Sequence, residues 1–177
     1  MKIMITGSSG FIGGTLKKLM EKDHEIVSYD LKEELDILDV KKLEKKMKGC
    51  DSVVHLAALT SVQDSLINPS KYYETNIVGT SNVFETAIKL GIKMVIYASS
   101  SAIYGATESP YGASKFTNEL LATVRKDKIR TIGFRFFNVY GSGMNLSYGA
   151  VIPNFIEGIN KTVYWYIDNK WWWKKLI

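Results

Sequence analysis

The sequence predicts an α/β protein built on a doubly wound parallel sheet, with helices covering both of its faces. Two observations lead to this prediction. Short apolar runs recur along the chain, and longer segments whose apolar residues repeat at helical spacing lie between them. The short runs are apolar at successive positions rather than alternating, which is typical of parallel strands buried on both faces.

Each apolar run predicts a strand, and each periodic segment predicts a helix. The predicted strands are KIMITG (2–7), EIVSYD (25–30), SVVHLAA (52–58), KMVIYASS (93–100) and TIGFRFFNVYG (131–141). The predicted helices cover 11–23, 40–49, 69–91, a segment that begins near Tyr111, and 150–160. The stretch between Asp30 and Asp36 is too short to hold a full crossover helix.

Composition narrows the class of protein. The 177 residues are enough for about one domain with a sizeable core. No apolar run reaches the roughly 18 residues of a membrane span, and the N-terminal residues lack the apolar stretch of a signal peptide. We therefore expect a cytoplasmic protein without a membrane partner. The single cysteine, Cys50, excludes an internal disulfide, and with only two histidines no metal site is expected.

The net charge of +5 raises the question of a nucleic-acid partner. Many of the lysines lie in DVKKLEKKMKGCD (39–51), where they are interleaved with Leu43 and Met47. This arrangement is typical of the solvent-facing side of an amphipathic helix. We therefore predict no nucleic-acid partner.

A glycine pattern follows the first predicted strand directly. Gly7, Gly10 and Gly13 occur in MITGSSGFIGG, at the start of a predicted helix that includes Phe11 and Ile12. The three glycines permit a tight turn, a close approach of a pyrophosphate, and close packing of helix on strand. The amide groups that begin the helix attract phosphate. An ordinary glycine-rich turn is the alternative, but the strand–turn–helix context favours dinucleotide binding.

An acidic residue ends the second predicted strand. Asp30 is placed to accept hydrogen bonds from the ribose hydroxyls of the dinucleotide and to repel a 2′-phosphate, which favours NAD over NADP. Asp36 and Ile37 lie near the expected position of the adenine. The alternative is that Asp30 is only a polar residue at a strand end.

Tyr111 and Lys115 stand four residues apart, so in a helix they share a face. A phenol has an ordinary pKa near 10, and a cation within roughly 4–6 Å favours its anion. We therefore expect Lys115, together with a positive nicotinamide ring, to lower the pKa of Tyr111 so that it acts as a base. Ser101 follows the end of the preceding strand, where side chains face the ligand crevice, and we expect it to bond substrate and share a proton with Tyr111.

These motifs occur in an order that resembles one family. They are the glycine turn, HLAA (55–58), YYETNIVGT (72–80), SSSAIYG (99–105), YGASK (111–115) and RFFNVYG (135–141). The chain resembles the extended short-chain dehydrogenases/reductases, in the NAD-dependent epimerase/dehydratase group that acts on nucleotide sugars. The resemblance covers residues 1 to about 158 and implies a Rossmann fold with NAD as cofactor.

The resemblance also implies roles for individual residues. The implied catalytic residues are Ser101, Tyr111 and Lys115. The implied cofactor contacts, beyond those named above, are Ala57, Ala58, Asn76, Ser99, Tyr111, Lys115 and Phe137. The implied substrate contacts are Ser101, Ala102, Tyr111 and Asn138. By contrast, His55 lies inside an apolar strand and is expected to be a packed, hydrogen-bonded residue. Arg135 could equally reach a phosphate or cap the edge of the sheet.

Within the family, dehydratases usually carry acids directly after the catalytic serine or threonine. Ala102 and Ile103 follow Ser101 here, so the resemblance favours a 4-epimerase of the UDP-glucose/UDP-galactose type. In that reaction Tyr111 removes the C4 hydroxyl proton while a hydride passes to NAD, and the 4-keto sugar takes the hydride back on its other face. Two alternatives stay open, namely a truncated NAD-binding protein without turnover and an NAD(P)H-dependent 4-keto-sugar reductase. A homodimer is a further expectation.

The end of the chain departs from the family pattern. We expect a dinucleotide-binding domain at 1–158 and an atypical tail at 159–177, the remnant of a truncated substrate domain that is otherwise largely absent. Three adjacent tryptophans, 171–173, fit neither a strand nor a helix period. Either a partner covers them, or this end is truncated or aberrant.

Overall fold

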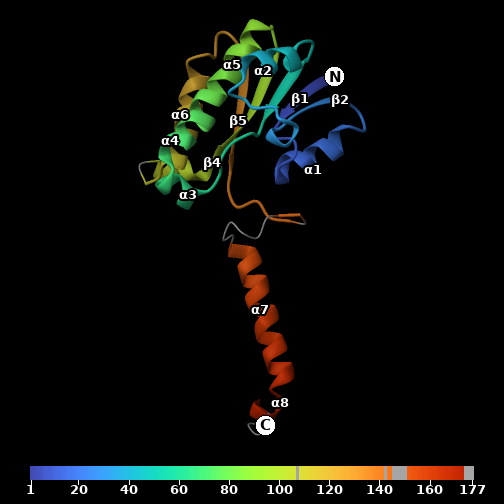
Figure 1. Ribbon diagram of the computed structural model, residues 1–177, viewed down its shortest axis with the longest axis vertical. Helices are drawn as coiled ribbons and strands as arrows, with labels where there is room; N and C mark the ends of the chain where they lie inside the picture. Colours follow the sequence, from blue (N-terminus) through green and yellow to red (C-terminus); the bar gives the residue numbers. More distant parts are fainter. Residues whose placement is uncertain (107, 142, 145–150, 174–177) are drawn as a thin grey trace. The chain divides into compact units, whose positions relative to one another are not determined.

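The computed structural model describes residues 1–106, 108–141, 143–144 and 151–173 (Figure 1). The chain divides into two compact units, Met1–Phe137 and Asn138–Ile177. The first unit contains the sheet and almost all of the predicted site. The second unit contains two helices in its described part, which begins with a short non-helical segment.

The first unit is built on a five-stranded sheet in the order β2-β1-β3-β4-β5, and every neighbouring pair of strands is parallel. The strands are β1 (Lys2–Thr6), β2 (Glu25–Tyr29), β3 (Ser52–His55), β4 (Met94–Ser100) and β5 (Arg130–Phe136). This confirms the predicted parallel α/β sheet. The strand order reverses between β1 and β3, and ligands of such sheets bind outside the carboxyl ends of the strands at this point.

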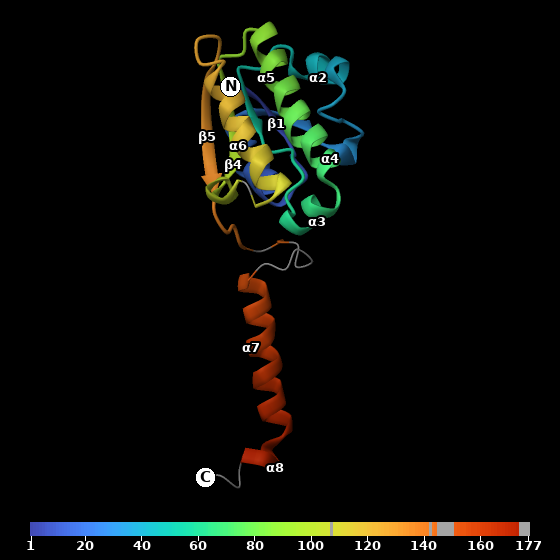
Figure 2. The ribbon, with the colours of Figure 1, turned by 90° about the vertical axis from the view of Figure 1, so that its left-hand side faces the viewer.

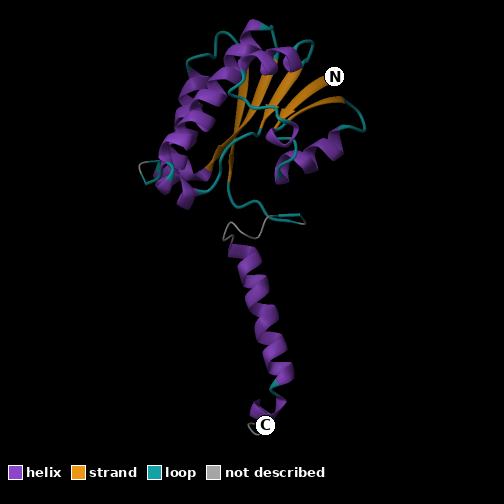
Figure 3. Ribbon diagram, in the orientation of Figure 1, coloured by secondary structure: helices purple, strands orange, loops and turns teal. Residues whose placement is uncertain are grey.

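The helices that follow the strands cover both faces of the sheet. The first unit contains α1 (Phe11–Met20), η1 (Leu31–Glu33), α2 (Val40–Met47), α3 (Val62–Ile67), α4 (Pro69–Tyr72), the π-helical η2 (Tyr73–Val78), α5 (Gly79–Lys89), η3 (Ser101–Gly105) and α6 (Pro110–Thr123). Figure 3 shows α1 on one face and α2, α5 and α6 on the other. Turning the molecule by 90° brings α5 and α6 side by side in front of the strands (Figure 2).

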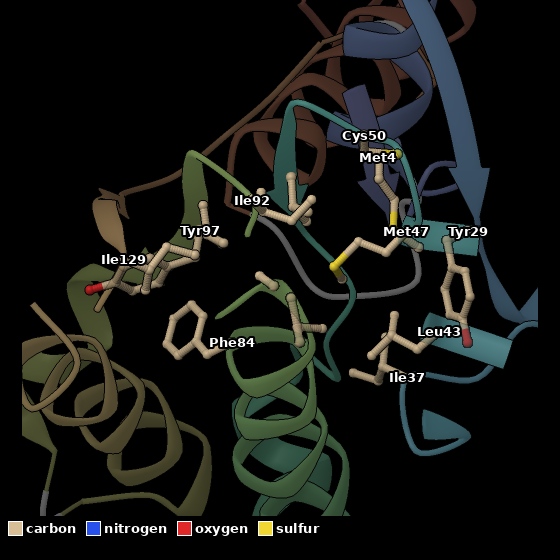
Figure 4. Packing of buried hydrophobic residues seen from close by; sticks show 14 of the residues in the cluster. Met4, Tyr29, Ile37, Leu43, Met47, Cys50, Phe84, Ile92, Tyr97 and Ile129 are labelled. Atoms are coloured by element: carbon tan, nitrogen blue, oxygen red, sulfur yellow. The ribbon is translucent and has the colours of Figure 1, made fainter. Parts of the chain in front are cut away.

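Successive side chains of β1 point to opposite faces of the sheet, so this strand contributes to a core on each face. Met4 points into a core shared with α2, α5 and α6, whereas Ile3 and Ile5 pack against α1. In the larger core, the rings of Phe84 and Tyr97 meet edge to face with 5.5 Å between centroids. Figure 4 shows Met4, Met47 and Cys50 gathered on one side of this core and Phe84 and Tyr97 on the other.

Three local predictions need revision. The fifth strand ends at Phe136, so residues 137–141 of the predicted strand lie beyond it. The predicted short helix at 150–160 is the start of a longer one, α7 (Val151–Asp168), which passes through the predicted boundary at 158. The third predicted strand, 52–58, is shorter than expected, because β3 ends at His55. The adjacent tryptophans lie in the short helix α8 (Lys170–Trp173). A single helical turn needs no apolar period, so their lack of one does not exclude it.

None of the helices in the described ranges is both long enough and apolar enough to cross a membrane.

Candidate active site

The glycine turn between β1 and α1 packs closely against neighbouring backbone and leaves no room for side chains at two of its glycines. Gly7 has a φ of +71°, which favours glycine, and a Cβ on it would stand 2.7 Å from the backbone nitrogen of Ala57. A Cβ on Gly13 would overlap the carbonyl oxygen of Gly7. The turn therefore needs glycine at both positions, for its conformation at Gly7 and for the packing of α1 at Gly13.

The start of α1 fits a phosphate. Gly10 is the N-cap residue, and in the described part of the chain no side chain caps this end of the helix. The first amide groups of α1, beginning at Phe11, are thus available to an anion. The hydroxyl of Ser8 is buried and has no hydrogen-bond partner among the described residues. A buried hydroxyl without a protein partner in the glycine turn fits a site at which a polar ligand supplies the hydrogen bond.

Asp30 lies beside this turn as predicted. Its Oδ2 accepts the Ser9 N–H at 2.9 Å, and its Oδ1 accepts the Lys32 N–H at 2.9 Å. The two bonds fix the carboxylate, and each oxygen retains acceptor capacity for a ribose hydroxyl. Ile37 is placed differently: its side chain is 4% exposed and belongs to the larger core. A contact of Asp36 or Ile37 with adenine stays a prediction.

Tyr111 and Lys115 are both buried at the start of α6, with 9% and 4% exposure. Ser109 caps the helix by accepting the Gly112 N–H, and Pro110 occupies its first turn. The Lys115 Nζ lies 6.0 Å from the centroid of the Tyr111 ring and donates to the Ala98 carbonyl at 2.9 Å. The pair that the spacing predicted is therefore brought together at the end of β4.

The pKa values of the pair differ from the expectation. Burial lowers the pKa of Lys115 to about 8. Burial also raises the pKa of Tyr111, and the hydrogen bond from the Ser100 side chain opposes this shift. The expected lowering of the Tyr111 pKa is therefore not seen, because burial has the larger effect and raises it.

The serine whose side chain lowers the pKa of Tyr111 is Ser100, the last residue of β4, while the role predicted for Ser101 stays a prediction. The Ser100 Oγ accepts the Ala102 N–H at 3.1 Å, so its own proton is free for the phenolic oxygen. Ser101 is the first, half-buried residue of η3. The sequence alone does not distinguish among the three consecutive serines. Which of them faces Tyr111 depends on where the strand ends.

A charged network joins α6 to the neighbouring strands. The Ser99 Oγ donates to Glu119 Oε1 at 2.6 Å, and Arg135 binds the same carboxylate through Nε at 2.9 Å and Nη2 at 2.8 Å. Arg135 also donates to the Tyr104 hydroxyl at 3.2 Å. The ion pair with Arg135 is the main reason why the pKa of Glu119 is lowered. Arg135 therefore ties the edge of the sheet to α6, and the Ser99 hydroxyl is engaged with Glu119. A contact of Ser99 with the cofactor stays a prediction.

Asn76 is fully buried in the π-helical turn η2. Its side-chain amide exchanges hydrogen bonds with the backbone of Leu59, at 2.9 Å and 3.0 Å, and its Nδ2 also donates to Ser114 Oγ at 3.1 Å. Ser114 Oγ in turn donates to the Tyr111 carbonyl at 2.7 Å. Asn76 thus connects the loop after β3 to the first turn of α6, and its predicted contact with the cofactor is untested.

The remaining predicted site residues follow β3, β4 and β5 along the chain. Ala57 and Ala58 are half-buried directly after β3, and Ala102 is half-buried in η3. Phe137 is 70% exposed, with its ring centroid 6.4 Å from that of Tyr104. Asn138 begins the second unit. The contacts predicted for these residues stay predictions.

His55 is packed and hydrogen-bonded, as predicted. Its Nδ1 lies 2.7 Å from Thr6 Oγ1 and its Nε2 lies 2.9 Å from Thr80 Oγ1. Burial, with a smaller contribution from the charge of Lys115, lowers the pKa of His55 from 6.5 to about 3.

A parallel sheet with a tight glycine turn at its carboxyl edge, and a buried tyrosine–lysine pair at the same edge, defines an α/β protein of the dinucleotide-binding class. Residues 3–170 match the model of the NAD dependent epimerase/dehydratase family, and the chain belongs to this family. This confirms the predicted family, whose description names the predicted cofactor.

Similar proteins are epimerases of nucleotide sugars. A UDP-glucose 4-epimerase of Mycoplasma genitalium is 34% identical over 71% of this chain and 45% of its own length. A UDP-N-acetylglucosamine 4-epimerase from Methanobrevibacter ruminantium, in complex with UDP-N-acetylmuramic acid, superimposes with a TM-score of 0.80 at 32% identity, over 91% of this chain and 63% of the other. The UDP-glucose 4-epimerase of Thermus thermophilus, in complex with NAD, gives a TM-score of 0.75 at 27% identity, over 82% of this chain and 58% of the other. The chain spans between 45% and 65% of the length of the curated relatives it matches.

The pKa of His55 predicts a pH dependence of stability. Between pH 6.5 and about 3 the unfolded chain takes up a proton at this imidazole and the folded chain does not. The free energy of unfolding should therefore fall as the pH is lowered below 6.5, by about 1.4 kcal/mol per pH unit from this group. Urea unfolding at pH 7, 6 and 5 of the wild type and of His55→Gln measures this difference. Equal changes with pH in the two proteins would contradict the assignment.

Proposed function

We propose that this chain carries the NAD-binding and proton-transfer part of a nucleotide-sugar 4-epimerase, with a UDP-glucose/UDP-galactose type of substrate. The observation that carries the proposal is the meeting of Ser100, Tyr111 and Lys115 at the carboxyl end of β4. Family membership and the similarity to UDP-sugar 4-epimerases support it.

The residues present fit an NAD molecule. The glycine turn and the start of α1 would hold the pyrophosphate, and Asp30 would accept the ribose hydroxyls. The half-buried residues Ala57 and Ala58 would line the cofactor beyond the carboxyl ends of β1 and β3, which are neighbours in the sheet. Bound NAD would supply the acceptor, and later the donor, of the hydride that epimerisation at C4 requires.

The proton transfer is assigned to Tyr111. Its phenolic oxygen would take the proton of the sugar C4 hydroxyl and later return one. Two groups would stabilise the phenolate that this role needs, the hydroxyl of Ser100 and the ammonium of Lys115, whose Nζ lies 6.0 Å from the ring centroid. A lysine whose pKa is about 8 is still mostly protonated at neutral pH, so Lys115 keeps its charge. The positive nicotinamide ring would add to the same effect.

The residues after Ser100 favour epimerisation over dehydration. Ser101 and Ala102 occupy the positions at which the family's dehydratases usually carry acids, and neither can exchange a proton as a carboxyl group does. Whether Ser100 or Ser101 serves Tyr111, the two positions that follow hold no acid, so this inference is the same. A second candidate, NAD binding without turnover, is favoured by the chain's coverage of only about half the length of its relatives.

Replacing Tyr111 by phenylalanine should remove epimerisation and leave NAD binding intact, because only the phenolic oxygen is lost. We expect turnover of UDP-galactose with catalytic NAD, followed by NMR, to fall by about 10²–10⁴-fold. The dissociation constant for NAD, from calorimetry, should stay within about twofold. The exposed Tyr73→Phe is the matched control and should match the wild type.

The outcomes separate the candidates. Undiminished turnover by Tyr111→Phe would remove the proposed base. A wild-type chain that binds NAD but neither binds nor converts UDP-sugars would favour the cofactor-binding protein, and stoichiometric consumption of NADH would indicate a reductase.

A homodimer is part of the same proposal. Phe116, Leu120 and Val124 are 44%, 50% and 74% exposed and stand four residues apart, so they form an apolar stripe along α6. We expect light scattering to give twice the mass of one chain, and Leu120→Glu to give the mass of a single chain. A wild-type mass of one chain would contradict this.

A further inference from the structure

A buried polar chain lies under the carboxyl edge of the sheet, outside the residues assigned to the reaction. It consists of Thr6 at the end of β1, His55 at the end of β3 and Thr80 on α5, with exposures of 0%, 4% and 1%. The two hydroxyls bracket the imidazole, at 2.7 Å from Nδ1 and 2.9 Å from Nε2. Buried polar groups at this depth need partners with the right donor and acceptor roles.

The direction of these hydrogen bonds follows from the capacity of one hydroxyl. Thr6 Oγ1 accepts the N–H groups of Leu56 and Ala57, each at 3.2 Å. A hydroxyl has two acceptor sites and one proton. The Leu56 N–H is shared with the Thr6 carbonyl oxygen at 3.1 Å, so the Ala57 N–H is the one that depends on this hydroxyl. Among the described residues, Nδ1 of His55 is the acceptor placed for the Thr6 hydroxyl proton, so this proton goes to Nδ1. The imidazole is then neutral, with its own proton on Nε2, and donates to Thr80.

The chain ends at the backbone that faces the glycine turn. Thr6 directly precedes Gly7, and the Ala57 nitrogen lies 2.7 Å from the position that a Cβ on Gly7 would occupy. The Thr6 hydroxyl therefore fixes the loop after β3 against the turn. The charged group that bears on His55 is Lys115 on α6, whose ammonium opposes protonation of the imidazole.

We propose that His55 is a positioning residue of the dinucleotide site. By accepting the Thr6 proton at Nδ1, it leaves both acceptor sites of that hydroxyl to the amides of Leu56 and Ala57, and so fixes the backbone that lines the cofactor. An imidazole with a proton on Nδ1 would compete with the Ala57 amide for the Thr6 oxygen, and the Thr6 proton would lose its acceptor. Only the effect on NAD rests on the proposed function.

The first test is the tautomer of His55. The chain has two histidines, so the His24→Gln variant leaves His55 as the only imidazole. Long-range ¹H–¹⁵N spectra of its ring should show the Nε2–H form from pH 8 to pH 5. A proton on Nδ1, or an imidazolium at pH 6, would overturn the proposal.

The second test changes Thr80. In this chain of hydrogen bonds Thr80 acts on the loop after β3 only through His55. Thr80→Val removes the acceptor of the Nε2 proton and favours the other tautomer. We expect amide hydrogen exchange at Ala57 to accelerate by about tenfold, and the dissociation constant for NAD to rise by about the same factor. A merely structural role would lower the melting temperature and leave both quantities unchanged, and that result would overturn the proposal.

Thr6 provides the conservative pair of variants. Thr6→Val should accelerate exchange at the Ala57 amide, whereas Thr6→Ser, which keeps the hydroxyl, should stay within about twofold of the wild type. The exposed Thr123→Val is the control and should change neither exchange nor NAD affinity. Failure of the wild-type chain to bind NAD would contradict the proposed function, and the ring spectra and amide exchange would still decide the role of His55.

Discussion

The site depends on the way in which α6 is held on the end of β4. Tyr111, Lys115 and Glu119 stand four residues apart on one face of α6, and they contact three consecutive residues of the strand, Ser100, Ala98 and Ser99 respectively. Arg135 on β5 holds Glu119 from the other side. Since the three contacts share one rigid helix, any slip of α6 along the strand would move the phenol, the ammonium and the carboxylate together.

This arrangement places a charge where water cannot reach it. Burial lowers the pKa of Lys115 from 10.5 to about 8, which corresponds to a cost on the order of 3 kcal/mol to folding at neutral pH. The cost is present below pH 8 and is relieved as the pH rises toward 10.5, because the unfolded chain then loses its proton as well. A structure that keeps a buried ammonium near a buried phenol sacrifices stability for the electrostatics of that site.

The sequence was sufficient for the features that follow from local pattern. The sheet, the glycine turn, Asp30 and the pairing of Tyr111 with Lys115 all follow from apolar runs, turn residues or helical spacing. The features it did not reveal depend on tertiary contacts. Ser100 could not be told from Ser101 without the end of the strand, and the ion pair of Glu119 with Arg135 joins two elements that only the fold brings together.

The central claim concerns the pKa of Tyr111, which burial raises and which nearby positive charge should lower. The absorbance of phenolate, titrated in the wild type and in Tyr111→Phe, gives the pKa of Tyr111 by difference. Without NAD we expect a pKa above the ordinary value of about 10, because burial dominates. With NAD bound, the added positive charge should bring it well below that value. An unchanged titration in the two states, or a free chain whose Tyr111 already titrates below 10, would contradict this account.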